Sequence, residues 1–278
     1  MQVLSGKEVA ASKQAALHTT LAALTAAGQQ PTLAIIVVGH DVPSAMYAQS
    51  MQKVATKKGL TANIYHITED VTEDHVISVI KRCNDADQIV GILLMMPLPD
   101  GMNRLRVINA IDPNKDVDGL TDVNIARLFS GRPGLVPCTP QAVMAILAYY
   151  HIDLDGKNVV VLGRSNVVGK PVAQLCLEQN STVTICHSHT KDLAKVTKTA
   201  DVLIVAIGKA KFVTADMVKP GAVVIDVGIN RENGKTVGDV DFTSVAAVAG
   251  AITPVPGGVG AVTTTIVLAN ALQGKGCI

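Results

Sequence analysis

The chain has 278 residues and a formal net charge of +1, and 48% of its residues are hydrophobic while only 3% are aromatic. A charge this close to neutral leaves no electrostatic footprint for nucleic acid or an anionic membrane, so we expect a small-molecule ligand. The five cysteines form no C-x-x-C pair, which argues against a zinc site or a disulfide framework and predicts a reducing compartment. They are Cys83, Cys138, Cys176, Cys186 and Cys277.

Residues 1–18 form a mixed amphipathic stretch without the continuous apolar core of a signal peptide. No apolar run approaches membrane-spanning length. We therefore expect a soluble, cytoplasmic protein. Its hydrophobic share comes from Ala, Val and Ile, an aliphatic core that suits α/β architecture.

Near-continuous apolar runs of strand length occupy residues 33–38, 62–67 and 89–95. Runs of this kind suit strands that helices cover on both faces, because half-exposed antiparallel strands would alternate with polar residues. The segments between them, 43–59 and 72–86, have helical spacing. The pattern predicts a parallel βαβ layout.

A stretch rich in Pro, Asp and Gly, residues 112–140, leads into a predicted helix over 139–150. Thr139 fits the N-cap of this helix and Pro140 its first turn, so we interpret it as a bridge between two domains. A second parallel α/β series follows, with strands predicted over 158–163, 182–186, 202–208 and 223–230.

The boundaries follow from these two series. We place a first domain at residues 1–138 and a second at 139–261. A helix over about 262–275 is expected to pack back on the first domain. Both domains are predicted to be α/β with parallel sheets.

The segment VVVLGRSNVVGKPVAQLC, residues 159–176, has the order strand, glycine turn, helix. Gly163 permits the turn, Gly169 allows close approach of helix to sheet, and the helix N-terminus is expected to offer free N–H groups to a pyrophosphate. Ser165 replaces the middle glycine of G-x-G-x-x-G. Dinucleotide binding and a plain strand-to-helix turn are both compatible with this loop alone.

Two neighbouring features favour NADP over NAD. An NAD site places Asp or Glu at the end of the second strand, yet that strand runs here into Cys186, His187 and Ser188. Arg164, directly after the turn glycine, could hold a 2′-phosphate, with Ser188 as a hydroxyl donor; a solvated surface charge is the alternative for Arg164. The histidines beside Ser188 lack partners at ligand spacing, so no metal site is predicted.

Six segments together resemble one family, methylenetetrahydrofolate dehydrogenase/methenyltetrahydrofolate cyclohydrolase. They are PNKDVDGLT (113–121), PCTP (137–140), LGRSNVVGKP (162–171), CHSHT (186–190), DVGINR (226–231) and TPVPGGVG (253–260). Their order and spacing match the family nearly end to end. The resemblance implies a two-domain protein, usually a homodimer, with a folate cleft between a catalytic domain and an NADP-binding Rossmann domain.

The resemblance also implies site residues. NADP would be held by Gly163, Arg164 and Ser165, by Ser188, and by the backbone near Ile229. Asp118 would accept paired N–H bonds from the folate pterin. A turn-capping role is the alternative for Asp118, and we expect that role for Asp116. The TPVPGGVG segment adds Pro256 and Gly257 as substrate-binding residues.

Tyr47 falls on the family's tyrosine, which lies on or near the pterin. The family's catalytic lysine follows four residues later, where this chain has Met51. Lys53 matches a second family lysine, and it cannot replace the first because residues two apart on a helix point in nearly opposite directions. The family's glutamine partner of the lysine corresponds to Met95.

Both polar partners have therefore become methionine. Losing only the lysine would leave a buried amide unpaired, whereas replacing both with flexible apolar side chains can be nearly neutral for stability. We interpret the pair as a repacked pocket. A sequencing or alignment error is the alternative, and Tyr47 in its expected place argues against a shifted register. Ala261, where the family commonly has proline, is a smaller difference.

The two family reactions need different chemistry. Oxidation of methylenetetrahydrofolate moves a hydride and passes no proton to the enzyme. Hydrolysis of the methenyl product requires proton transfer, to which a positioned lysine contributes roughly a hundred- to ten-thousandfold. We therefore predict an NADP-dependent dehydrogenase whose cyclohydrolase step is lost or weak. A dehydrogenase of another reduced pterin and a non-catalytic NADP-binding paralogue are the alternatives.

Overall fold

The computed structural model describes residues 1–68 and 70–274 of the chain. The chain forms two compact units, each assembled from two separate stretches. One unit contains Lys13–Cys138 and the chain from Thr264 onward, and we call it the three-stranded unit. The other contains Met1–Ser12 and Thr139–Thr263, and we call it the six-stranded unit.

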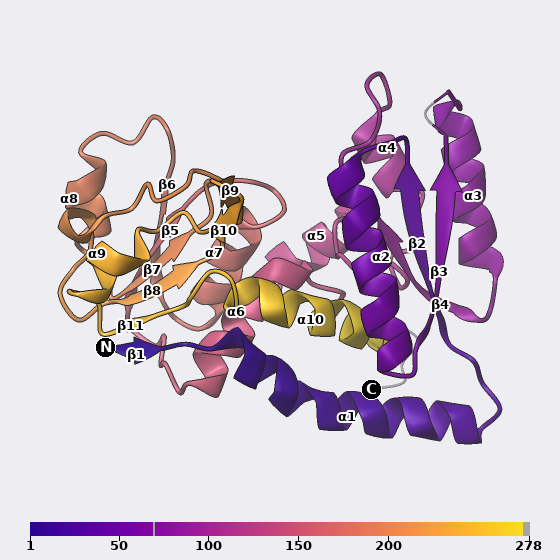
Figure 1. Ribbon diagram of the computed structural model, residues 1–278, viewed down its shortest axis with the longest axis horizontal. Helices are drawn as coiled ribbons and strands as arrows, with labels where there is room; N and C mark the ends of the chain where they lie inside the picture. The colour runs from indigo at the N-terminus through magenta and orange to yellow at the C-terminus, as the bar shows by residue number, and fades with distance from the viewer. Residues whose placement is uncertain (69, 275–278) are drawn as a thin grey trace. The chain divides into compact units, whose positions relative to one another are not determined.

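The three-stranded unit is built on a parallel sheet in the order β3-β2-β4 (Figure 1). Every residue of β2 and β4 is buried, as their continuous apolar sequences predict. Ile35 in the central strand pairs with Ile64 on one side and Leu93 on the other. The strands are β2 (Thr32–Val38), β3 (Thr61–Ile67) and β4 (Ile89–Leu94).

Helices follow the strands of this unit, and their starts are capped by side chains. Asp41 accepts the Ser44 N–H at the start of α2 at 2.8 Å, and Thr72 accepts the His75 N–H at the start of α3. Helix α2 packs against β2 and β3. The helices are α2 (Val42–Lys57), α3 (Glu73–Asp85), α4 (Arg104–Ile108) and α5 (Asp122–Phe129).

The six-stranded unit has a fully parallel sheet in the order β1-β11-β8-β7-β5-β6 (Figure 1). A separate antiparallel pair joins β9 to β10. The sheet strands are β1 (Gln2–Val3), β5 (Asn158–Leu162), β6 (Thr182–Cys186), β7 (Val202–Val205), β8 (Val223–Asp226) and β11 (Ala251–Ile252). The pair consists of β9 (Asn230–Glu232) and β10 (Lys235–Val237).

After β5 the chain adds β6 on one side and then returns to add β7 on the other side of β5. This reversal creates a topological switch point at the carboxyl ends of β5 and β7, where open α/β sheets bind their ligands. The short helices of this unit are α7 (Gly169–Glu178), α8 (Leu193–Thr197), the 3₁₀ helix η1 (Ala215–Met217) and α9 (Phe242–Ala246).

Three helices each contain residues that belong to both units: α1 (Gly6–Ala26), α6 (Cys138–Tyr149) and α10 (Val259–Gln273). Helix α6 begins at Cys138, so Thr139 lies inside its first turn and is not the N-cap that the sequence predicted. Cys277 and the predicted end of the last helix at 275 lie outside the described residues. Within the described residues, 1–68 and 70–274, no helix is both long enough and apolar enough to cross a membrane.

The predicted two-domain α/β architecture with parallel sheets is confirmed, but the course of the chain differs from the prediction at its start. Residues 1–12 belong to the six-stranded unit, whereas the sequence placed them in the first domain. The physical reason is β1, which pairs in parallel with β11 through Gln2 and Ala251. The later boundary falls between Cys138 and Thr139, and the chain from Thr264 packs with residues 13–138.

Candidate functional site

The loop after β5 makes a close approach to the end of β7. Gly163 has a φ of 128°, and a Cβ there would lie 2.2 Å from the carbonyl oxygen of Ala206. A Cβ on Gly169 would lie 2.2 Å from the carbonyl oxygen of Gly163. Any larger side chain at either position would force the loop away from the sheet or from α7. The predicted roles of the two glycines therefore have a direct steric basis.

The start of α7 does not offer the free N–H groups that the sequence predicted. The Ser165 hydroxyl accepts the Gly169 N–H at 3.3 Å, and the Ser165 carbonyl accepts the Lys170 N–H at 3.0 Å. Pro171 has no N–H, and Val172 donates to Val168. Among the described residues of this loop and the first turn of α7, the N–H groups of 164–167 donate to no protein acceptor. A phosphate at this site would therefore meet the loop and not the helix end.

A cavity of about 300 Å³ opens at the switch point between β5 and β7. It brings together four of the predicted cofactor residues, Gly163, Arg164, Ser165 and Ser188. Arg164 and Ser188 are both exposed. The remaining lining residues are Leu162, His187, Leu193, Ala206, Ile207, Lys209 and Phe212.

The charges of this switch-point cavity favour an anion. Arg164 and Lys209 are cationic, and the described lining contains no carboxylate. The Lys209 ammonium lies 5.6 Å from the centroid of the Phe212 ring. The loop that carries Ser188 is held by Thr190, whose hydroxyl accepts the His187 N–H at 2.9 Å. The cavity therefore combines cations with an exposed aromatic ring, a lining that suits a phosphorylated nucleotide.

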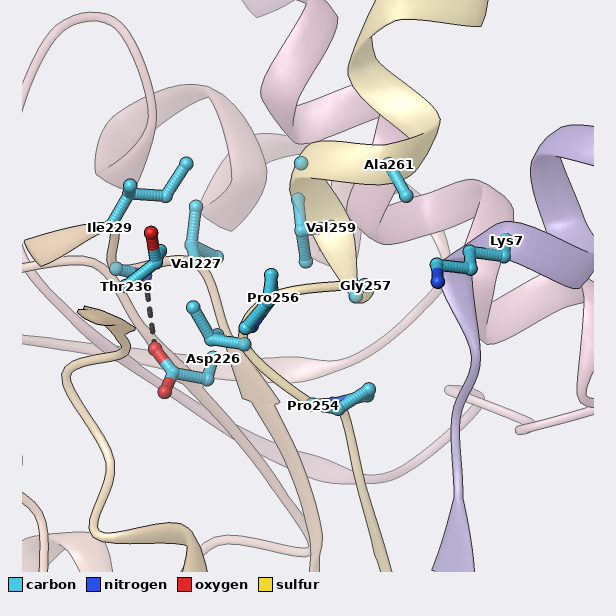
Figure 2. A pocket seen from close by; sticks show the side chains of 14 residues that line it. Lys7, Asp226, Val227, Ile229, Thr236, Pro254, Pro256, Gly257, Val259 and Ala261 are labelled. Carbon is cyan, nitrogen blue, oxygen red and sulfur yellow. Dashed lines mark hydrogen bonds between the residues drawn. The ribbon is translucent and has the colours of Figure 1, made fainter.

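A second cavity of about 300 Å³ lies in the same unit, beside the chain that follows β8 (Figure 2). It brings together Ile229, which the resemblance implied for the cofactor, and Pro256 and Gly257, which it implied for the substrate. Figure 2 shows the Lys7 side chain reaching toward Gly257, and Asp226 lies on the opposite side of the cavity. Gly257 is in the left-handed region, with a φ of 102°.

Asp226 is buried beside this second cavity. Burial raises the pKa of its carboxyl to about 6, although three backbone N–H groups bind the carboxylate and oppose the shift. They are donated by Gly228, Asp239 and Val240, each at 3.0 Å. Because these bonds use the carboxylate, Asp226 shapes the cavity wall and is not a free anion facing a ligand.

In the three-stranded unit, Asp118 and Cys138 lie close enough to Tyr47 to add to the burial that raises its pKa, and Asp118 likewise adds to the raised pKa of Cys138. Burial raises the pKa of the Asp118 carboxyl to about 6, and neighbouring Asp116 adds to the shift. Burial, followed by Asp118 and Cys138, raises the pKa of Tyr47, although 44% of this residue is exposed. Asp118 is thus a partly buried carboxyl beside a tyrosine hydroxyl, as a polar ligand site requires.

Two residues next to Asp118, Asp116 and Cys138, are held by hydrogen bonds within the turn. Asp116 is buried and accepts the Thr121 N–H at 2.8 Å, which is the turn-holding role expected for it. The Cys138 thiol donates to the Val117 carbonyl at 3.0 Å, and burial raises its pKa well above its usual range. A thiol held protonated in this way is not a nucleophile.

Met51 and Met95 are both buried, with 0% and 8% of their surface exposed. Met51 lies on the face of α2 that includes Ser44, Ala48 and Ala55, all buried. Met95 directly follows β4, and its N–H donates to the Ile36 carbonyl at 2.8 Å. Lys53 is exposed. The structure therefore places thioethers in the interior at the positions where the family has a lysine and a glutamine, and the exposed Lys53 does not replace either.

Sequence reasoning missed several residues of these sites. Lys7 lines the second cavity although it lies far from the other lining residues in the chain. Asn270 donates to the Val117 and Val136 carbonyls at 2.8 and 3.1 Å and so supports the Asp118 turn. Asp239 holds the loop after β7. Their partners are distant in sequence, and only the glycine next to Asp239, in VGDVD, hints at a close backbone contact.

Both the N-terminal and the C-terminal part of this chain are similar to domains of known proteins. Residues 4–118 match the catalytic domain of tetrahydrofolate dehydrogenase/cyclohydrolase, and residues 137–276 match its NAD(P)-binding domain. The bifunctional protein FolD of Streptococcus agalactiae is 47% identical over 274 residues, which cover 98% of this chain and 96% of that protein.

Solved structures agree with this similarity. The bifunctional FolD methylenetetrahydrofolate dehydrogenase/cyclohydrolase of Campylobacter jejuni superposes with a TM-score of 0.96 at 40% identity, covering 99% of this chain and 98% of that one. The Trypanosoma brucei enzyme, solved with NADP and an inhibitor, gives a TM-score of 0.92 at 34% identity, covering 98% and 96% of the two chains.

Proposed function

Because the chain belongs to the tetrahydrofolate dehydrogenase/cyclohydrolase family, we propose that it oxidises 5,10-methylenetetrahydrofolate to 5,10-methenyltetrahydrofolate with NADP. The observation that carries this proposal is the switch-point cavity, which unites Gly163, Arg164, Ser165 and Ser188. The relative from Trypanosoma brucei was solved with NADP.

The residues of the switch-point cavity fit the adenosine half of NADP. Arg164 and Ser188 would hold the 2′-phosphate, and the free N–H groups of residues 164–167 would face the pyrophosphate. The backbone near Ile229, in the second cavity, would hold the nicotinamide half. Bound NADP supplies the hydride acceptor.

The folate side of the proposal rests on the three-stranded unit and on the second cavity. Asp118 would accept N–H bonds from the pterin, and Tyr47 would lie against the pterin ring. Pro256 and Gly257 would contact the substrate from the second cavity. These residues would bind and orient the substrate, and the hydride step requires no proton transfer from them.

We propose further that cyclohydrolase activity is lost or strongly reduced. Hydrolysis needs a group that can take a proton from water and return one to a folate nitrogen. Met51 and Met95 are buried at the positions of the family lysine and glutamine, and a thioether can do neither. The burial of both side chains supports a repacked apolar pocket rather than a solvated gap.

Two assays on the purified protein test these proposals separately. NADP reduction with methylenetetrahydrofolate should proceed, while methenyltetrahydrofolate should decay no faster than in buffer. The double variant Met51→Lys/Met95→Gln should gain hydrolysis. Met95→Gln alone is the matched control and should not, because it adds no proton carrier. Robust hydrolysis by the wild type would refute the loss of this activity, and absence of NADP reduction would refute the dehydrogenase.

The altered pocket favours one alternative, an NADP-dependent dehydrogenase of another reduced pterin. Thermal shifts with folate and non-folate pterins separate the two substrates, and a non-catalytic paralogue would bind NADP without hydride transfer. The homodimer and the cytoplasmic location stay predictions. Sedimentation of the purified protein tests the dimer, and cell fractionation tests the location.

A further inference from the structure

Asp239 is completely buried in the six-stranded unit and accepts four hydrogen bonds from two separate segments. One carboxylate oxygen accepts the N–H groups of Ile207 and Gly208 at 2.7 and 2.9 Å. The other accepts the Lys209 N–H at 2.8 Å and the Asn230 side-chain amide at 2.9 Å. Asp239 thereby joins the chain after β7 to the chain after β8.

Each of these segments forms part of a different cavity. Ile207 and Lys209 line the switch-point cavity together with Arg164. Asn230 directly follows Ile229, which lines the second cavity. A single carboxylate therefore holds the backbone of residues 207–209 beside one cavity and the side chain of Asn230 next to the wall of the other.

The packing around Asp239 leaves it little freedom to move. A Cβ on Gly228 would lie 2.2 Å from an Asp239 carboxylate oxygen. The Asp239 N–H donates to the buried Asp226 carboxylate at 3.0 Å. Only a carboxylate offers two acceptor oxygens to this set of donors, because an asparagine would turn its own N–H groups toward backbone N–H groups.

We propose that Asp239 is a positioning residue for the dinucleotide, which holds the walls of the adenosine and nicotinamide cavities in register. This inference rests on the proposed function, since it requires NADP to span both cavities. Asp239 does not line either cavity. Asp239 acts on the switch-point cavity through its hydrogen bonds to residues 207–209, and on the second cavity through its hydrogen bond to Asn230.

Calorimetric titration with NADP and with adenosine 2′,5′-bisphosphate, a fragment that fills only the adenosine side, tests the proposal. Asp239→Asn should weaken both ligands at least tenfold, because one of the two oxygens that accept N–H groups of the 207–209 segment becomes an NH2 donor facing them. Asn230→Ala should weaken NADP several-fold yet leave the fragment within twofold of wild type, because Asp239 still holds residues 207–209. This ligand-dependent split would not arise from a loss of stability alone.

Asp201→Asn is the matched control. Asp201 also accepts a backbone N–H, from Asn158 at 2.9 Å, and binds Lys219 at 2.7 Å, but it precedes β7 at the opposite end of the strand. This variant should bind both ligands like the wild type, whatever its melting temperature.

Unchanged NADP affinity in Asp239→Asn, or equal losses for both ligands in Asn230→Ala, would overturn the inference. If Asp239→Asn does not fold, the Asn230→Ala comparison decides alone. Absence of NADP binding by the wild type would overturn the proposed function and this inference with it. Normal binding by the wild type with unaffected variants would overturn the inference alone.

Discussion

Replacing Asp118 with asparagine should stabilise the protein above pH 6 while it weakens folate binding. Burial raises the pKa of this carboxyl from 3.8 to about 6, so the folded state holds the proton more tightly than the unfolded state does. The resulting cost to stability is absent below about pH 4, grows as the pH rises toward 6, and is fully present above it. Asparagine carries no charge and avoids that cost.

The magnitude follows from the shift. At about 1.4 kcal/mol per pKa unit, the change corresponds to about 3 kcal/mol at pH 8 before screening. Asp118 is only partly buried, so solvent screening should reduce the gain to about 1–2 kcal/mol. At pH 4.5 the stability gained by Asp118→Asn should be about 1 kcal/mol smaller than at pH 8, because the wild-type carboxyl is then largely protonated in the folded state.

Urea unfolding of the wild type and Asp118→Asn at pH 4.5 and pH 8 measures this difference. Asp100→Asn, which changes an exposed aspartate in the same unit, is the control and should shift neither midpoint. An Asp118→Asn protein that is less stable than the wild type at pH 8, or equally stabilised at both pH values, would refute the reasoning. A lower folate affinity in the stabilised variant would show that this carboxyl is retained for binding at the expense of stability.

Three further changes test other parts of the structure. Arg164→Gln should weaken NADP by about 10- to 100-fold in a titration and leave NAD unchanged, because only NADP carries the 2′-phosphate; equal losses for both would contradict this role. Gly169→Ala should abolish NADP binding and lower the melting temperature, since its Cβ would lie 2.2 Å from the Gly163 carbonyl oxygen; normal binding would show that the loop can shift. Lys115→Met should cost about 2–3 kcal/mol in urea unfolding, because its ammonium binds the Cys83, Asn84 and Ala86 carbonyls at the end of α3; a neutral change would mean that water replaces it.

The sequence was most informative where local composition decides the structure. The apolar runs at 33–38 and 89–95 predicted strands that are in fact buried along their length, because covered parallel strands need apolar side chains on both faces. The glycines at 163 and 169 marked the close approaches that the structure shows. Family motifs placed Arg164 and Ser188 in one cavity although they lie on separate strand ends.

Prediction failed where distant segments decide the outcome. Strand β1 has only two residues, too few for any periodicity, and only its pairing with β11 shows that residues 1–12 belong to the six-stranded unit. The Gly169 and Lys170 N–H groups at the start of α7 donate to the hydroxyl and to the carbonyl of Ser165, contacts that the motif does not specify. The sequence did not single out Asp239, because its donors come from two other loops.

The pairing of β1 with β11 bears on how the protein is made. Gln2 leaves the ribosome well before its partner Ala251 is synthesised. The β11 edge of the sheet therefore cannot close during most of translation, and residues 2–3 must wait without a partner. Deleting this short strand should leave β11, β8, β7, β5 and β6 able to pair, with β11 as the new edge strand. Protease protection of residues 2–3 in stalled nascent chains should therefore appear only after Ala251 has left the ribosome.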